Sequence, residues 1–172
     1  MKMRKVLLLV ATFAMLPIAS GADDSALAAQ KLAGQVKQAK VSLERGLAVS
    51  EKEGTPISGK FELEDGNLQL SVYTEKGGKY YEVVVDHSTG KIAKVEEVTS
   101  GDDLTSAKAQ AEAMSKAKRS LRAAVTAAQK AHKGFRAIGV IPSLTAAHPM
   151  ATVTVNKEHE TRKVGARSGN PT

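Results

Sequence analysis

The 172-residue chain contains no cysteine and no tryptophan, and its aromatic residues are three Tyr and three Phe. Without cysteine, the protein can form no disulfide, perform no thiol chemistry and build no cysteine-ligated zinc site. The low aromatic content predicts a core of Ala, Val, Leu and Ile. Because 42% of the residues are apolar and charges of both signs are present, a wholly disordered chain is excluded. The length allows one or two small domains.

Residues 1–22 have the three-part pattern of a secretory signal peptide. Three basic residues lie within the first five positions, an apolar run covers residues 6–16, and Pro17 precedes a series of small residues. A membrane anchor is the alternative, but it needs about 20 apolar residues, nearly twice the length of this run. We therefore expect cleavage after Gly21 or Ala22, no transmembrane segment in the mature chain, and a location in the bacterial periplasm or outside the cell.

Charge is distributed unevenly along the mature chain. The full sequence has a net charge of +7, and removal of residues 1–22 lowers it to +4. Residues 41–103 contain 13 acidic and 7 basic residues, whereas residues 104–172 contain 3 acidic and 12 basic residues. This asymmetry predicts two units with different surfaces, which could associate head to tail or bind an acidic partner.

The first half reads as a helix followed by strands. Apolar residues recur at spacings of three and four from Leu32 to Leu47, which predicts one amphipathic helix that ends before Gly54. Apolar residues then alternate with polar ones between Phe61 and Val98, interrupted by short turns. Because short connections cannot join parallel strands, this pattern predicts an antiparallel meander of four strands.

The second half shows the same change from helical to strand periodicity. A single helix is expected from Asp102 to about His132, since acidic residues favour a helix start and Gly134 favours its end. The strands expected after it cover residues 135–141, 150–156 and 162–166. Pro142 is expected to break the first of them, and residues 165–172 to form a loose tail.

The two halves also resemble each other weakly. The sequence Gln-Ala-Lys-Val-Ser-Leu at 38–43 is similar to Lys-Ala-Lys-Arg-Ser-Leu at 116–121, and Gly59 and Gly139 are 80 residues apart. A degenerate tandem duplication is the simplest explanation, and chance similarity between two Ala-rich helices is the alternative. We predict an α+β fold of two units, residues 23–100 and 101–172, each with a helix packed on a small antiparallel meander sheet.

One hairpin resembles a known family. The strand Tyr80–Asp86, followed by Ser88-Thr-Gly-Lys-Ile92, is similar to the ending of the PepSY domain, a "YxVxVD" strand and a "xTGKv" hairpin. The resemblance covers residues 38–98 well and 116–166 poorly, because the second half lacks the Asp and the Thr-Gly-Lys. PepSY domains occur in propeptides of thermolysin-type metallopeptidases and in exported bacterial proteins. The resemblance therefore implies inhibition or regulation of a peptidase. The residues of this hairpin motif are Tyr81, Asp86, Thr89, Gly90 and Lys91.

The hairpin motif predicts a structural role and no nucleotide site. Asp86 is expected to accept hydrogen bonds from the amides of the following turn, and Gly90 to supply the positive φ of a bulge. A phosphate-binding loop would need a glycine where Val85 stands and a Ser or Thr where Ile92 stands. We therefore expect no nucleotide and no other cofactor.

The sequence offers no arrangement of catalytic or metal-binding residues. The four histidines are widely separated, so exposed loop histidines are the favoured interpretation, with the Glu158-His159-Glu160 segment able to coordinate only weakly. No nucleophile elbow is present. The carboxylates of Glu62, Glu64 and Asp65 are predicted to lie at a solvated strand edge and in the turn that follows it. We expect no metal and no enzymatic activity. The four histidines are His87, His132, His148 and His159.

Basic residues gather on one side of the predicted second helix and just beyond it. This set could bind phosphate groups, anionic lipid or an acidic protein surface, and a solvated outer helix face is the alternative. Nucleic acid is disfavoured by export and by the lack of neighbouring aromatics, and membrane insertion by the Ala-rich apolar side. The seven residues are Lys116, Lys118, Arg119, Arg122, Lys130, Lys133 and Arg136.

These patterns together predict a non-enzymatic exported binding protein. Its partner would be another exported protein, a peptidase if the PepSY resemblance holds, and its contact surfaces would be strand edges or the basic helix face. The alternative is a structural or anion-binding envelope protein. Such a protein would use its basic face, or its halves of opposite charge, to self-associate or to bind an acidic polymer.

Overall fold

The computed structural model of the protein describes residues 21–157 and 160–167. The predicted signal peptide up to residue 20, the residues Glu158 and His159, and the last five residues of the predicted tail lie outside the described residues. Within the described part of the chain, no helix is long and apolar enough to cross a membrane.

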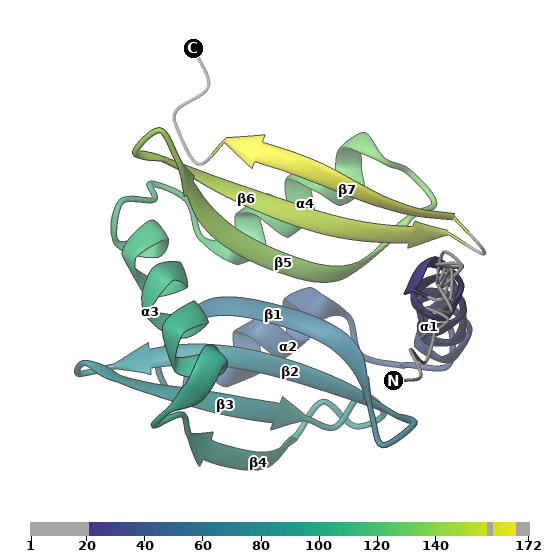
Figure 1. Ribbon diagram of the computed structural model, residues 1–172, viewed down its shortest axis with the longest axis horizontal. Helices are drawn as coiled ribbons and strands as arrows, with labels where there is room; N and C mark the ends of the chain where they lie inside the picture. The colour runs from purple at the N-terminus through teal and green to yellow at the C-terminus, as the bar shows by residue number, and fades with distance from the viewer. Residues whose placement is uncertain (1–20, 158–159, 168–172) are drawn as a thin grey trace, which may run out of the picture.

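The described residues belong to the predicted α+β class, with four helices and seven strands (Figure 1). The helices are α1 (Gly21–Val36), α2 (Leu43–Ser50), α3 (Gly101–Ser115) and α4 (Leu121–Ala131). The strands are β1 (Thr55–Glu64), β2 (Asn67–Lys76), β3 (Lys79–Val85), β4 (Ile92–Glu97), β5 (Arg136–Thr145), β6 (His148–Lys157) and β7 (Glu160–Arg167).

All seven strands form one antiparallel sheet in the order β4-β3-β2-β1-β5-β6-β7. The four-stranded meander expected from the first half is β1 to β4, and the three strands of the second half are β5 to β7. The two meanders are joined through β1 and β5, where Gly59 pairs with Val140 and Lys60 with Gly139. Periodicity identifies strands but not the edges that pair, so this junction was not predictable from the pattern.

Helices cover both faces of the sheet. Figure 1 shows α2 and α4 behind the sheet and α3 in front of it, across the junction of the two meanders. The core between the sheet and the helix pair α2 and α4 consists mainly of fully buried aliphatic side chains, as the composition predicts. Gly59 allows α2 to lie close to β1, because a Cβ there would be 3.2 Å from Leu47 and 3.3 Å from Leu43.

The single helix predicted from Leu32 to Leu47 is wrong, because the chain forms two helices there. α1 ends at Val36, and α2 begins after Ser42, whose hydroxyl accepts a hydrogen bond from the Arg45 amide at 3.2 Å. A serine in this position satisfies a free amide of the first turn and so favours a new helix start. The apolar positions predicted from helical spacing still face the core, since Val36 and Leu47 are fully buried.

The single helix predicted from Asp102 to His132 is interrupted in the same way. α3 ends at Ser115, and Ser120 caps α4 by accepting a hydrogen bond from the Ala123 amide at 3.2 Å. Capping serines inside two Ala-rich segments therefore decide the helix boundaries, which apolar spacing alone does not reveal.

The prediction that Pro142 breaks its strand is also wrong, because β5 continues to Thr145. Pro142 pairs with Ala151 of β6. On its other side, β5 pairs with β1 only at Gly139 and Val140, so no hydrogen bond to β1 is lost at the proline. Residues 165–167, expected in the loose tail, belong to β7.

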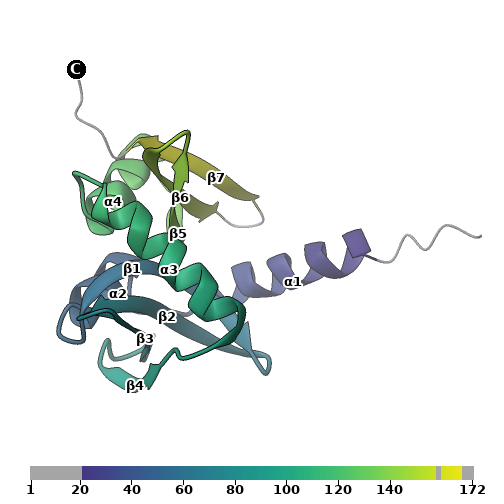
Figure 2. The same cartoon turned by 60° about the vertical axis from the view of Figure 1, so that its left-hand side comes forward.

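α1 extends away from the rest of the molecule (Figure 2). Residues 27–31 are exposed, and the Leu27 side chain retains 66% of its accessible surface. Only the last turns of the helix reach the sheet, where Ala33 and Val36 are buried. The compact part of the protein therefore begins near residue 32.

Candidate functional site

The hairpin between β3 and β4 has the hydrogen bonds that the sequence predicts. One carboxylate oxygen of Asp86 accepts bonds from the Ser88 and Thr89 amides, each at 2.8 Å, and these bonds lower the pKa of Asp86. The Gly90 amide donates to the Asp86 carbonyl at 2.8 Å, and Gly90 has the expected positive φ of 73°. Lys91 closes the turn by accepting a bond from the Asp86 amide at 2.9 Å.

This hairpin supports the linker between α1 and α2. The His87 carbonyl accepts hydrogen bonds from the amides of Lys40 at 2.9 Å and Val41 at 3.0 Å. Gly90 lies against Val41, and Tyr81 is half-buried within β3, where it pairs with Thr74. The residues of the hairpin motif thus fix a turn and a linker, and they form no enclosed chemical site.

Arg136, one of the seven predicted basic contact residues, does not belong to a basic surface. It is the first residue of β5, and its guanidinium donates to the carbonyls of Val36 at 3.0 Å, Ala39 at 2.8 Å and Val41 at 2.5 Å. It also lies over the Phe61 ring, 5.4 Å from the centroid. Burial lowers the pKa of Arg136, although an arginine remains charged at neutral pH. This side chain is a latch between the two halves.

Two further members of the predicted set form ion pairs. Lys116 pairs with Glu112 one turn earlier at 2.8 Å, and Arg122 pairs at 3.1 Å with Glu51, the residue that follows α2. Glu51 is 71 residues away in the sequence, so only the tertiary fold creates this ion pair.

Only part of the predicted basic set forms a cluster. Arg119, Arg122 and Lys130 line one hollow of about 400 Å³ on the outer surface of α4. Lys118 lies exposed in the α3–α4 linker, and Lys133 lies exposed after α4. The structure thus brings together three of the seven residues.

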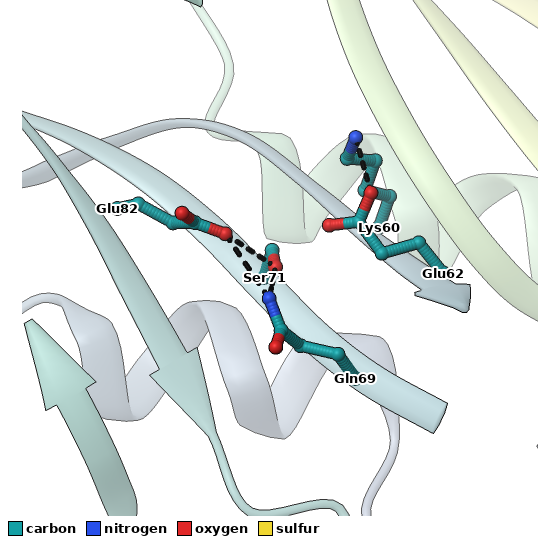
Figure 3. A network of polar contacts seen from close by, with 5 residues as sticks. All are labelled: Lys60, Glu62, Gln69, Ser71 and Glu82. Carbon is teal, nitrogen blue, oxygen red and sulfur yellow. Dashed lines mark hydrogen bonds and ion pairs between the residues drawn. The ribbon is translucent and has the colours of Figure 1, made fainter. Parts of the chain in front are cut away.

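A polar surface that the sequence reasoning missed lies on the first-half sheet, on the face opposite α2. Strand alternation turns Phe61, Leu70 and Val83 toward the core, so the polar residues between them project to the other side. Figure 3 shows five of these polar side chains from β1, β2 and β3. They are Lys60, Glu62, Gln69, Ser71 and Glu82.

Hydrogen bonds hold these side chains in place. One carboxylate oxygen of Glu82 accepts from the Ser71 hydroxyl at 2.7 Å and from the Gln69 amide nitrogen at 3.2 Å (Figure 3). The same Gln69 nitrogen donates to the Ser71 hydroxyl at 2.8 Å. Lys60 pairs with Glu62 at 2.5 Å on β1. The carboxylates are therefore presented in defined orientations.

A hollow of about 380 Å³ lies over this surface, beside the start of α3. Burial raises the pKa of the Tyr73 phenol there, and the carboxylates of Glu82 and Asp103 raise it further. We call this surface the acidic sheet face. Its carboxylates are those of Glu62, Glu64, Glu82, Glu96 and Asp103, with Lys60 and Lys94 among them.

Glu62 and Glu64 lie on β1, which pairs with β2 along its length but with β5 only at Gly59 and Lys60. Both residues therefore lie beyond the junction with β5, where Glu64 is exposed and Glu62 is partly buried. Asp65 does lie in the turn that follows, with a φ of 49°. The missed signal is the alternation of polar residues in three successive strands, which forms a surface once Glu62 pairs with Gln69 and Tyr73 with Glu82.

Metal ligands are not grouped in the described part of the chain. Within residues 21–157 and 160–167, no three His, Asp or Glu side chains could hold one metal ion together. His87, His132 and His148 lie on separate elements. His159, in the segment expected to coordinate weakly, lies outside the described residues.

No family model and no curated protein matches the chain. The crystal structure of a putative lipoprotein from Clostridium difficile 630 matches 72% of this chain and 81% of its own, at 13% identity and a TM-score of 0.38. A likeness of that size assigns neither a family nor a function, so the PepSY resemblance stays a prediction.

Proposed function

We propose that the mature chain is a non-enzymatic exported binding protein that contacts a basic region of another exported protein through its acidic sheet face. The observation that carries the proposal is the ordered network of Gln69, Ser71 and Glu82 on a sheet surface with an open hollow above it. Carboxylates held in fixed positions lose little side-chain entropy when a cationic segment binds. They also attract such a segment from a distance.

We further propose that the chain is a tandem of two PepSY-like units. The order helix, helix and three antiparallel strands occurs twice, as α1-α2-β1-β2-β3 and as α3-α4-β5-β6-β7. Ser42 and Ser120 cap the second helix of each series, and the first hairpin of each turns through two residues of positive φ, 65–66 and 146–147. Within the described residues β4 has no counterpart after β7, which agrees with a degenerate second copy.

The compartment and the partner class rest on the sequence. Residues 1–22 have the pattern of a secretory signal, which supports a periplasmic or secreted location. The PepSY resemblance implies a peptidase as the partner. Inhibition assays with the mature protein against a panel of secreted metallopeptidases test this point, and an unchanged rate for every enzyme would argue against it.

The acidic sheet face is tested by cross-linking in the native envelope. A variant with Glu64→Gln, Glu82→Gln and Asp103→Asn should lose its cross-linked partner, because it removes the three carboxylates of the face that form no ion pair with a described residue. Glu62 and Glu96, in contrast, pair with Lys60 and Lys94. The matched control changes three carboxylates elsewhere, Glu53→Gln, Asp65→Asn and Glu112→Gln, and should retain the partner. Equal cross-linking by both variants would contradict the proposed surface.

A second candidate function is supported by the hollow that Arg119, Arg122 and Lys130 line on α4. This hollow lies on α4, which covers the face of the sheet opposite to the acidic sheet face, so copies could stack through surfaces of opposite charge. Gel filtration of the mature protein at low and high salt tests this structural role. An elution volume that does not change with salt or with the Arg119→Gln and Lys130→Gln changes would contradict it.

A further inference from the structure

A cavity of about 600 Å³ opens where the two halves of the chain meet. It lies between the C-terminal end of α2, the start of β1, the turn after β2 and the start of α4. Its apolar lining comes from the partly exposed Pro56 and Met114, with the buried side chains of Leu47 and Leu121 beneath them. A volume of this size falls within the range of roughly 300 to 1,000 Å³ that is typical of small-molecule sites.

No side chain fills this cavity beside the α3–α4 linker, whereas a side chain does fill the corresponding place beside the α1–α2 linker. At the start of β5, the Arg136 side chain reaches into the α1–α2 linker and donates to three of its carbonyls. Arg136 pairs with Asn156 near the end of β6, as Thr55 pairs with Glu75 near the end of β2. Thr55 is short and exposed, so the space beside the α3–α4 linker is left free.

The charges around the cavity favour an anion. Arg122 engages Glu51 at 3.1 Å, and a Glu75 carboxylate oxygen accepts a bond from the Gly78 amide at 2.8 Å, so both acids already have partners. Lys52 and Lys76 also line the cavity and are exposed. Neither lysine forms an ion pair with any other described residue. The α4 N-terminus at the cavity adds positive potential.

We propose that this cavity binds a small amphipathic carboxylate, an apolar body that carries a single acid group. The apolar body would lie on Pro56 and Met114, and the carboxylate would face Lys52 and Lys76. Both a medium-chain fatty acid and the free C-terminus of an apolar peptide have this chemistry. The site goes beyond the proposed partner binding and does not depend on it, because the acidic sheet face belongs to a different part of the molecule.

The ligand chemistry is tested by NMR on the full mature chain with labelled Met and Leu methyl groups. The probes are decanoate and N-acetyl-Ala-Leu with a free carboxylate, each compared with its neutral amide. We expect shifts at the Met114 methyl, and binding of the carboxylate about tenfold tighter than that of the amide. The probe that shifts Met114 at the lower concentration identifies the source. Absence of a shift with either carboxylate at millimolar concentration, or equal binding of the amides, would overturn the proposal.

Two variants test the location of the site. Changing Lys52 and Lys76 to Gln should weaken decanoate binding roughly fivefold to tenfold, because two partly exposed charge contacts are lost. The matched control, Lys37→Gln with Lys108→Gln, removes the same charge from exposed residues outside the cavity and should bind as the wild type does. Thr55→Trp should fill the cavity and abolish the shifts, while aromatic residues remain favourable in a strand. Unchanged binding by either cavity variant would overturn the site.

Discussion

The α1–α2 and α3–α4 linkers make the same turn but are fixed by different means. In each, an amide donates back to the carbonyl three residues earlier, Ala39 to Val36 and Ala117 to Met114, and a serine then caps the next helix. The first linker is also held by Arg136 from the other half and by the His87 carbonyl. Beside the second linker lies a cavity. The same local geometry therefore gives a closed, latched site in one half and an open one in the other.

Among the variants that test this comparison, replacement of Arg136 should lower the stability most. Arg136→Ala removes a donor from three carbonyls, of which only that of Val36 keeps another, the Ala39 amide, and it exposes the Phe61 ring. We therefore expect the free energy of unfolding to fall by about 3 kcal/mol. Arg122→Ala, which removes an exposed ion pair, should cost no more than about 1 kcal/mol. Urea unfolding followed by circular dichroism measures both. Equal losses for the two variants would show that the contacts of Arg136 with the first linker stabilise the fold no more than an exposed ion pair does.

A second test compares two glycines of positive φ. Gly90→Ala places a Cβ 3.4 Å from Val41 of the first linker, whereas Gly77→Ala meets nothing within 4 Å. Both changes carry the backbone cost of a left-handed alanine, about 1 kcal/mol. We expect a further loss of at most a few tenths of a kcal/mol for Gly90→Ala, because its Cβ would lie at the near limit of ordinary contact with Val41. Thermal unfolding of the pair measures the difference, and a larger loss for Gly77→Ala would contradict the role of the hairpin.

The two capping serines provide a third test. Ser42→Ala and Ser120→Ala should each lower stability by about 1 kcal/mol. The local response should differ, because Arg136 holds the first linker in place even without its cap. Hydrogen exchange should therefore accelerate more at the Ala124 amide in Ser120→Ala than at the Gly46 amide in Ser42→Ala, by roughly fivefold. Equal acceleration at both amides would mean that the latch does not protect the first helix.

The comparison also explains which parts of the structure the sequence predicts. Apolar spacing identifies the core positions and the strands correctly, since Leu47, Val72 and Val83 are all fully buried. At two places the spacing predicts one helix where the structure has two. The break at each place depends on a capping serine, which makes a single side-chain hydrogen bond and leaves the apolar spacing uninterrupted. The sequence pattern also assigns Arg136 to a surface, because its partners lie 95 to 100 residues away in the sequence. Strand pattern likewise does not specify which edges pair, so neither the junction of β1 and β5 nor the acidic sheet face was predicted.

The smallest expected effect concerns Asp86, whose turn is predicted in the first half alone. Because the Thr89 and Ser88 amides lower the pKa of Asp86 in the folded state, the folded protein releases this proton more readily than the unfolded chain does. The stabilisation is present above the unfolded pKa of about 3.9, and it is lost as the pH falls through the folded pKa. Asp86→Asn keeps an acceptor oxygen that does not titrate. Its unfolding midpoint in urea should therefore fall less steeply than that of the wild type as the solution is acidified below about pH 4. If the two midpoints changed in parallel, the hairpin carboxylate would not contribute to the pH dependence.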